Sequence, residues 1–412
     1  MKLRKLALTA GATIAAALCT ESAIAAPCSS LGAQPLVWIE NGDTQEPLIK
    51  RLGEKLLNSQ TPLRIVYKNR RTCDLANDYF KSLPIVNDTI LIKYIPTQTE
   101  VPGWDPSKAS PTCEADDAGN PIDLAIGATF ISSCSADIQN AKPNDVAIKD
   151  GPVQSYGFIV PTGSSQVALT AEEGYFVFGY ADGGGMASPW TSSALRFIRG
   201  ATASTALTTS AAIGLKAANL KGTIPPGNTS DEVLDLVKNS PDPEKTIGLM
   251  GTEVYDAKGR GAGVKLLAFK AFKQKYAYFP DSTNATFDKN NVRDGHYLPW
   301  SPTPYITKVD GTGKATSANV QRIIDLVFGQ KDEADVGGLE QVVKSGLVPQ
   351  CAMKVKRDFD GSNIALYSAP EPCGCFMDAK VPGGATKCAT CTGEGTACGA
   401  GGKCRHGYCE AR

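Results

Sequence analysis

The sequence predicts an α/β protein made of two halves of similar style, followed by a small cysteine-rich module. Three observations indicate this fold class. Short apolar runs and amphipathic segments alternate as strand, helix and strand over residues 30–155, and the same alternation returns over residues 156–295. From about Ala369, large apolar residues almost disappear and Cys, Gly, Lys and Thr predominate. The strand–helix–strand order is typical of a mostly parallel sheet with crossover helices.

The elements of the first half are predicted from their apolar periods. Residues 36–39 form an apolar run typical of a buried strand. Leu48, Leu52 and Leu56 recur every four residues, which predicts an amphipathic helix over residues 47–58. Further strands are predicted over residues 63–67, 89–95 and 122–128.

The second half repeats this style with more helix. Its predicted strands cover residues 156–160 and 246–249, and its predicted helices cover residues 168–178, 206–220, 233–237 and 264–276. Residues 296–350 then return to proline-rich strand and end with a helix over residues 320–328.

The first 25 residues have the three parts of a secretory signal peptide. Lys2, Arg4 and Lys5 give a positive start, an apolar run follows, and small residues occupy the two positions that a signal peptidase reads. The run is shorter than the roughly 20 residues that a spanning helix needs. We therefore expect residues 1–25 to be removed and the mature chain to have no membrane span. The expected location is the periplasm, the medium or the cell surface.

The charge balance excludes a nucleic-acid partner. The chain has 42 basic and 42 acidic residues, and removing residues 1–25 leaves 39 basic and 41 acidic ones. Binding to a phosphate backbone needs a clear excess of positive charge, which this composition lacks. The sequence also contains no phosphate loop, no His-Glu-x-x-His and no Gly-x-Ser-x-Gly. We expect no cofactor and no metal.

The cysteines indicate disulfides. Thirteen cysteines minus Cys19 in the signal peptide leave twelve, an even number in an exported chain. Residues 369–412 are too short and polar to fold by burial alone, so cross-links must hold them. The C-x-x-C spacing of Cys388 and Cys391 leaves a zinc site as the rival interpretation. Seven of the twelve lie in this module: Cys373, Cys375, Cys388, Cys391, Cys398, Cys404 and Cys409.

Seven is an odd number, so one cysteine of the module is expected to pair with Cys351. The four that remain, all in the first half, then pair among themselves. We expect Cys113 to pair with Cys134, on either side of one strand, and Cys28 to pair with Cys73. Spacing alone does not determine this connectivity.

Six short landmarks, in the right order, resemble the periplasmic phosphate-binding-like family, the two-lobed type II solute receptors of uptake transporters. Residues 122–129 (IDLAIGAT) resemble a strand that ends in Gly-Ala-Ser-Asp. Residues 199–205 (RGATAST) resemble an Arg-x-x-Gly-Ser-Gly-Thr loop before a helix. The other landmarks lie within residues 157–179, 246–249, 292–299 and 346–349.

The resemblance covers roughly residues 35–352 and implies a two-lobed fold, each lobe a mostly parallel sheet flanked by helices. Lobe 1 would contain residues 30–155 and 296–366, and lobe 2 residues 156–295. The disulfide module, residues 369–412, would be an addition to the family's fold.

The resemblance also implies an anion site in the cleft between the lobes, where helix N-termini present free N–H groups. Plainer interpretations remain open: Asp43 or Thr44 can simply cap a helix, the paired arginines can form a solvated turn, and the third arginine can be a surface residue. Four loops supply the candidate ligand-binding residues Thr44, Gln45, Arg70, Arg71, Thr72, Thr129, Arg199, Ser204 and Thr205.

Two carboxylates of the family's site are replaced. Phe130 stands where the family has an Asp that accepts a hydrogen bond from a protonated phosphate. Ala201 stands where another Asp would fix the arginine. We therefore expect a pocket that takes phosphate or another oxyanion or carboxylate, without selecting a protonated one. A pocket that has lost binding is the alternative.

The sequence does not favour catalysis. It has two histidines, and a Ser-His-Asp triad would have to use His296 because His406 lies in the module. Acid pairs such as Asp358 and Asp360 are common surface features. A hydrolase that depends on His296 is therefore the weakest hypothesis.

We expect a non-enzymatic, monomeric solute-binding protein. Its partners would be a small anionic solute and either an ABC permease or a cell-surface partner. The rival hypothesis is a secreted or surface interaction protein, of the adhesion type, that keeps the same fold without transport. The cysteine-rich module favours this rival, since a plain transport receptor does not need it.

Overall fold

The computed structural model describes residues 26–182, 187–399 and 402–411. The predicted signal peptide lies outside these residues. Among the described residues, no helix is both long and apolar enough to cross a membrane.

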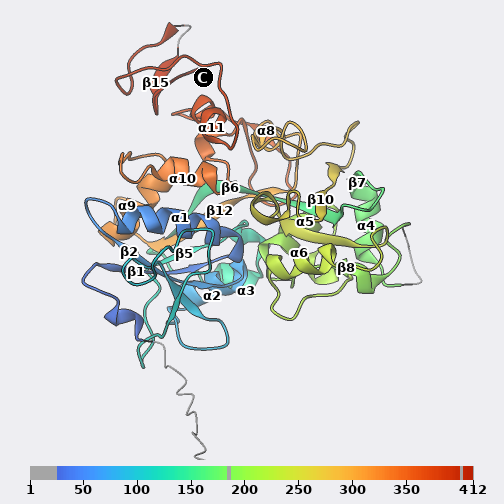
Figure 1. The fold of residues 1–412 in the computed structure, drawn as a ribbon, viewed down its shortest axis with the longest axis horizontal. Helices are drawn as coiled ribbons and strands as arrows, with labels where there is room; N and C mark the ends of the chain where they lie inside the picture. The colour runs from blue at the N-terminus through green and yellow to red at the C-terminus, as the bar shows by residue number, and fades with distance from the viewer. Residues whose placement is uncertain (1–25, 183–186, 400–401, 412) are drawn as a thin grey trace, which may run out of the picture.

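The two-lobed α/β architecture is confirmed (Figure 1). One sheet of ten strands runs through both lobes in the order β4-β3-β2-β1-β5-β12-β6-β9-β8, with β10 paired to β6. Its strands are β1 (Leu36–Asn41), β2 (Arg64–Asn69), β3 (Ile92–Tyr94), β4 (Thr112–Cys113), β5 (Leu124–Ile126), β6 (Val146–Pro161), β8 (Arg196–Phe197), β9 (Ile247–Gly251), β10 (Val264–Leu266) and β12 (Trp300–Lys308).

The first lobe is built on the parallel strands β2, β1 and β5, with antiparallel β3 and β4 at one edge. Because the strands are parallel, their carboxyl ends meet at one edge of the sheet, and the loops that follow them lie together there. Its helices are α1 (Glu46–Leu57), α2 (Thr72–Phe80), α3 (Ala136–Asn140), α9 (Ala318–Val327) and α10 (Gly338–Lys344).

Helix α1 illustrates why these residues fold as they do. Leu48, Leu52 and Leu56 lie on one face, are at most 1% exposed and pack against Ile65 of β2 in one apolar cluster. At roughly 2 kcal/mol for each fully buried leucine, this face supplies most of the helix's stabilisation. The helix predicted over residues 47–58 is therefore confirmed.

Two long strands connect the lobes. The first part of β6 pairs with β12 and its last part with β9 and β10, so one strand belongs to both lobes. In the second lobe, β9 lies between β6 and β8. A separate pair of strands is formed by β7 (Ala168–Thr170) and β11 (Ala268–Lys270), and β7 contacts helix α4 (Ala171–Gly179). The other helices of this part of the chain are α5 (Ser204–Ala212), α6 (Ser230–Lys238), α7 (Thr252–Val254) and α8 (Asn290–Arg293).

Three helix predictions in the second lobe need correction. The helix predicted over residues 264–276 is wrong: this stretch forms β10 and β11, because Val264 and Leu266 alternate with outward Lys265 and pair with β6. The helix predicted over residues 206–220 ends at Ala212, since Gly214 adopts a positive φ of 74° that terminates it. In the helix predicted over residues 168–178, residues 168–170 instead form strand β7.

The expectation of disulfides is confirmed, but the suggested pairing in the first lobe is wrong. Cys28 pairs with Cys113, and Cys73 pairs with Cys134. The first disulfide fastens the N-terminal segment to β4, and the second fastens the first turn of α2 to the loop after β5. Both depend on how the strands are ordered in the sheet, which sequence spacing does not reveal.

The C-terminal module is cross-linked to itself and joined to the body. Cys351 pairs with Cys373, as expected for one module cysteine. Helix α11 (Gly374–Lys380) places Phe376 in the main apolar core, although we expected almost no core here. The remaining pairs are Cys375–Cys388, Cys391–Cys404 and Cys398–Cys409, next to the hairpin of β15 (Lys403–Arg405) and β16 (Tyr408–Glu410).

The sulfur atoms of Cys391, Cys398 and Cys409 lie within 4.8 Å of one another. Each is bonded in a disulfide, so none is a thiolate that could bind zinc. The zinc interpretation of the C-x-x-C spacing is wrong for this structure.

Candidate ligand cleft between the lobes

A cavity of about 620 Å³ opens between the two lobes. The first lobe contributes the loops that follow β1 and β2, together with Lys93 of β3, and the second lobe contributes Arg199 and the turn before α6. Four cationic side chains face two carboxylates across this cavity. The charged residues that line it are Asp43, Arg70, Arg71, Asp74, Lys93 and Arg199.

Arg199 lies at the base of the cavity and is 3% exposed. Its Nη1 donates to Asp43 Oδ2 at 3.1 Å and to Ser230 Oγ at 2.7 Å, and its Nε donates to Asn228 Oδ1 at 3.1 Å. The Ser230 N–H also donates to Asp43. Asp43 and Asn228 therefore hold the arginine in place of the acid that is missing at Ala201.

The Asp43–Arg199 pair crosses from one lobe to the other. Burial raises the pKa of the Asp43 carboxyl, but the Arg199 guanidinium and the Ser230 N–H outweigh it and hold that pKa below its usual range. Asp43 is thus ionised at neutral pH. It forms an ion pair with Arg199, the arginine that an anionic ligand would otherwise bind. Among the plainer interpretations, a surface role for Arg199 and a simple capping role for Asp43 are both excluded.

Arg70 and Arg71 have different surroundings. Arg70 donates twice to Asp78 Oδ2, at 3.1 and 2.5 Å, and lies 3.9 Å from Glu40. Arg71 donates its Nε to Asp74 at 2.5 Å, lines the cavity and has 47% of its side chain exposed. Its Nη1 reaches the second lobe, because a Cβ placed on Gly200 would lie 3.6 Å from it. Arg71 is thus the more accessible of the two.

The remaining candidates do not line the cavity and are buried: Thr44, Gln45, Thr72, Thr129, Ser204 and Thr205. Thr72 Oγ1 accepts from the Ala128 N–H at 3.0 Å, which fixes the loop after β5. The hydroxyls of Thr44 and Thr205 and the Oε1 of Gln45 have no hydrogen-bond partner among the described residues. Buried polar atoms are rarely left unpaired, so these are atoms that a bound polar group would satisfy.

Thr129 binds a carboxylate of the same chain. Its Oγ1 donates to Asp360 Oδ2 at 2.5 Å, as does Ser133 Oγ at 2.5 Å, and Thr208 Oγ1 of helix α5 lies 3.4 Å from Oδ1. Burial raises the pKa of Asp360, while the hydroxyls of Ser133 and Thr129 lower it. Asp360 is therefore not the surface acid that the sequence indicated, whereas Asp358 is exposed.

The acceptors in the cleft are only partly visible in the sequence. Phe130 and Ala201 are not acids, but Asp43 and Asp360 bring carboxylates to the same donors from other parts of the chain. No local signal identifies Asp360, which is 231 residues from Thr129. The family resemblance points to the family's own acid positions, and neither Asp43 nor Asp360 is one of them.

A buried amide and acid lie behind Gln45, where the lobes join. Gln45 Nε2 donates to Gln154 Oε1 at 3.1 Å, and Gln154 Nε2 donates to Glu253. Burial raises the pKa of Glu253 well above its usual range, so this carboxyl is held neutral. Sequence reasoning missed Glu253, because nothing around it in sequence marks it as buried.

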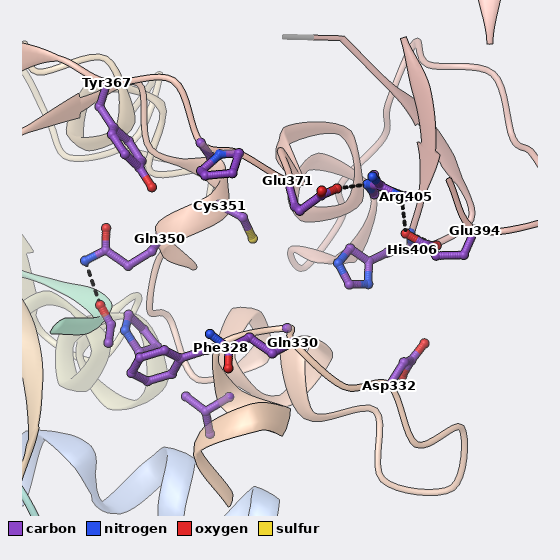
Figure 2. Close-up of a pocket in the computed structure, with 16 residues that line it drawn as sticks. Phe328, Gln330, Asp332, Gln350, Cys351, Tyr367, Glu371, Glu394, Arg405 and His406 are labelled. Carbon is purple, nitrogen blue, oxygen red and sulfur yellow. Dashed lines mark hydrogen bonds and ion pairs between the residues drawn. The ribbon is translucent and has the colours of Figure 1, made fainter. Parts of the chain in front are cut away.

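A second cavity, of about 590 Å³, lies between the first lobe and the cysteine-rich module (Figure 2). Arg405 points to Glu371 and Glu394 there and pairs with both. The His406 ring packs on Phe376, with 5.4 Å between ring centroids. Acids outnumber cations in this cavity, so it is less suited to an anion than the cleft. His296 lines neither cavity; its Nδ1 lies 2.8 Å from Asp294.

No family model and no curated protein matches the sequence. Similar folds occur among solved structures. A protein described as a phosphate ABC transporter substrate-binding protein with bound phosphate, from Clostridium perfringens, is 12% identical, with a TM-score of 0.49 over 76% of this chain and 99% of that chain. An ABC-type phosphate transport receptor from Vibrio cholerae is 12% identical, with a TM-score of 0.45 over 76% and 99%.

A phosphate-binding protein from Stenotrophomonas maltophilia is 11% identical, with a TM-score of 0.46 over 77% of this chain and 91% of that chain. At these identities, and with TM-scores below 0.5, the likenesses decide nothing about the ligand. The function is inferred from the residues of the cleft.

Proposed function

We propose that this protein is an extracytoplasmic, non-enzymatic solute-binding protein that captures an anion between its two lobes. One observation carries the proposal: the cavity between the lobes is lined by four cationic side chains and two carboxylates. A cleft with an excess of one charge raises the local concentration of the opposite charge. Arg71 and Arg199 come from different lobes, so an anion that binds both would bridge them.

Contacts that exist only when the lobes meet would drive closure. Such contacts include a hydrogen bond from the Cys73 N–H to the Thr202 carbonyl at 3.5 Å and the contact of Thr129 Oγ1 with Thr208 Oγ1 at 2.8 Å. A bound anion would add its own bridge to these. The strands β6 and β12, which run between the lobes, are the natural hinge.

The ligand class is phosphate or another oxyanion or carboxylate. Guanidinium groups bind planar carboxylates and phosphates in a bidentate manner, and three of them, those of Arg70, Arg71 and Arg199, line the cavity. Phosphate, for which the similar solved proteins are named, belongs among the anions to test. An ABC permease would be the partner of a transport receptor, and a monomer would be its working form.

A thermal-shift screen of the purified mature protein tests the proposal. Phosphate, sulfate, citrate and short dicarboxylates, added at constant ionic strength, are expected to include at least one that raises the melting temperature by several degrees in a saturable way. If none does, the cleft is not an anion site and the proposal fails.

The alternative, a secreted or surface interaction protein, has its own supporting observation. Leu366 is 91% exposed and Phe359 is 53% exposed, and both precede the cysteine-rich module in the sequence. Exposed large apolar side chains can serve as contacts at interaction sites. Replacing both with Ser would abolish retention at the cell surface under this alternative, while leaving it unchanged for a transport receptor.

A further inference from the structure

The strongest unexplained feature is the partly buried contact between Asp360 and a group of hydroxyls. We call Thr129, Ser133 and Thr208 the hydroxyl pocket. Thr129 and Ser133 follow β5 in the first lobe, and Thr208 lies on α5 in the second lobe. All three hydroxyls lie within 3.4 Å of the Asp360 carboxylate, and Thr129 Oγ1 also lies 2.8 Å from Thr208 Oγ1. One carboxylate thus joins both lobes.

A short hairpin carries Asp360 into this position. Strands β13 (Val355–Lys356) and β14 (Ala365–Leu366) pair in antiparallel register, and Asp360 lies in the turn between them. Gly361, with a φ of +79°, allows the chain to reverse directly after Asp360, and a Cβ there would lie 3.5 Å from Ala211 of α5. The turn therefore lies against the second lobe.

Two contacts of Arg357 fix the hairpin in place, and a third contact lies within its turn. The Arg357 guanidinium lies 3.9 Å over the Trp300 ring, and its Nη2 donates to the Leu298 carbonyl at 2.8 Å. Ser362 Oγ donates to the Phe359 carbonyl at 2.8 Å within the turn. The hairpin is thus attached to the start of β12, one of the two strands between the lobes.

A disulfide confines the hairpin to this region of the molecule. Cys351 and Cys373, on either side of it, are bonded across 22 residues. A covalent closure of this length reduces the conformations open to the segment when it leaves its site. The local concentration of the Asp360 carboxylate at the hydroxyl pocket is therefore high, as for any tethered ligand.

From this geometry we propose that the hydroxyl pocket is a subsite for a carboxylate or a small oxyanion, and that its resident occupant is Asp360 of the same chain. The second part of this inference rests on the proposed function: Asp360 sets specificity. By filling the hydroxyl pocket, it keeps small oxyanions out of that pocket and leaves the solute the cavity lined by Arg71 and Arg199, which we call the outer cavity. The solute is therefore an organic anion larger than formate, acetate or sulfate.

The test is rescue by a free carboxylate. Asp360→Ala removes a carboxyl group and leaves a space that matches formate. The full mature chain carrying this substitution is expected to melt lower than the wild type by about 3 °C, and formate or acetate is expected to restore most of this loss with saturation. Chloride at equal ionic strength is expected to restore nothing.

Two control variants separate the subsite from general effects. Asp358→Ala removes an exposed carboxylate from the same hairpin, and formate is expected to leave its melting temperature unchanged. Asp360→Asn keeps the pocket filled with a group of the same size, so it too is expected to ignore formate. A response of either variant equal to that of Asp360→Ala contradicts the inference.

The inference is also overturned if Asp360→Ala folds and neither formate nor acetate raises its melting temperature. In that case the Asp360 contact would serve only the packing of the hairpin. If this variant does not fold, formate present during refolding is expected to restore the yield of folded protein, and an unchanged yield would also contradict the inference.

Calorimetry then tests specificity: Asp360→Ala is expected to bind sulfate or phosphate at least tenfold more tightly than the wild type. Equal affinities contradict the specificity role.

The outcomes are distinguishable from those of the proposed function. Formate rescue requires no solute in the outer cavity, so the hydroxyl pocket can be shown even if the anion screen of the wild type fails. Conversely, a wild type that binds an organic anion at Arg71 establishes the proposed function even if Asp360→Ala ignores formate.

Discussion

At the scale of single residues, the cleft is a set of cations already paired with the chain's own acids. Arg199 is bound to Asp43, Arg71 to Asp74 and Arg70 to Asp78. A ligand anion must therefore compete with carboxylates that are held at high local concentration. The affinity of the cleft depends on these acids as much as on the arginines.

Asp43→Asn tests this competition. The substitution removes a negative charge beside Arg199 but retains an oxygen that can accept from the Ser230 N–H. We expect the affinity for an anion to rise about three- to tenfold in calorimetry, because one repulsive charge at this distance contributes roughly 1 kcal/mol in a partly solvated site. Asp137→Asn, an exposed acid on α3, serves as the control and should leave the affinity unchanged. Weaker binding by Asp43→Asn would contradict the competition.

Glu40 gives the protein a pH dependence. It lies near the end of β1 next to Arg70 and is 3% exposed. Its pKa is raised to about 8, mainly by burial and also by Asp78, although Arg70 and Lys68 lower it. The folded protein keeps this proton up to about pH 8, whereas an unfolded chain releases it near the ordinary glutamate pKa of 4.5. Stability is therefore expected to fall as pH rises through this window.

Urea unfolding at pH 5.5 and pH 8.5 measures the effect. We expect the wild type to lose roughly 3 kcal/mol of unfolding free energy from Glu40 between these values. Glu40→Gln has no proton to lose and should reduce the difference by that amount. An equal difference in both proteins would show that Glu40 is not held neutral.

At the scale of elements, the periodicity of apolar residues correctly predicts those helices and strands whose formation depends mainly on contacts close in sequence. The four-residue period of leucines identifies α1, because one buried face decides that helix. The helix predicted for the stretch that forms β10 and β11 is wrong, because the strand character of this stretch comes from pairing with β6 and β7, far away in sequence. The same reason explains why the predicted pairing of the first-lobe cysteines is wrong.

The Cys73–Cys134 disulfide affects both the stability of the fold and the position of the residues at the site. It fastens the first turn of α2, which carries Thr72, to the loop after Thr129. Replacing both cysteines with Ser opens a loop of 61 residues and is expected to cost about 3–4 kcal/mol of unfolding free energy, measured with urea. The double variant should also bind the anion more weakly, because Arg71 loses its fixed position. If the folded variant binds the anion as tightly as the wild type, the disulfide does not contribute to the anion site.

At the scale of the whole molecule, two lobes meet through β6 and β12, and a hairpin from the C-terminal region enters between them. The arginines of the cleft could be located from the sequence, since each belongs to a loop recognisable by what surrounds it. Asp43 as a partner and Asp360 as an occupant could not. Those roles arise only when distant segments come together, and no pattern within either segment encodes them.

The measurement that tests the central claim most directly is a calorimetric titration of wild type and Arg71→Ala with the anion that stabilises the protein most. Arg71 faces the cavity and is partly exposed, so its loss should leave the fold intact. We expect saturable binding by the wild type, at least tenfold weaker binding by Arg71→Ala, and wild-type affinity in Lys81→Ala at the other end of α2. Equal affinity of wild type and Arg71→Ala would place the anion outside the cleft and contradict the account.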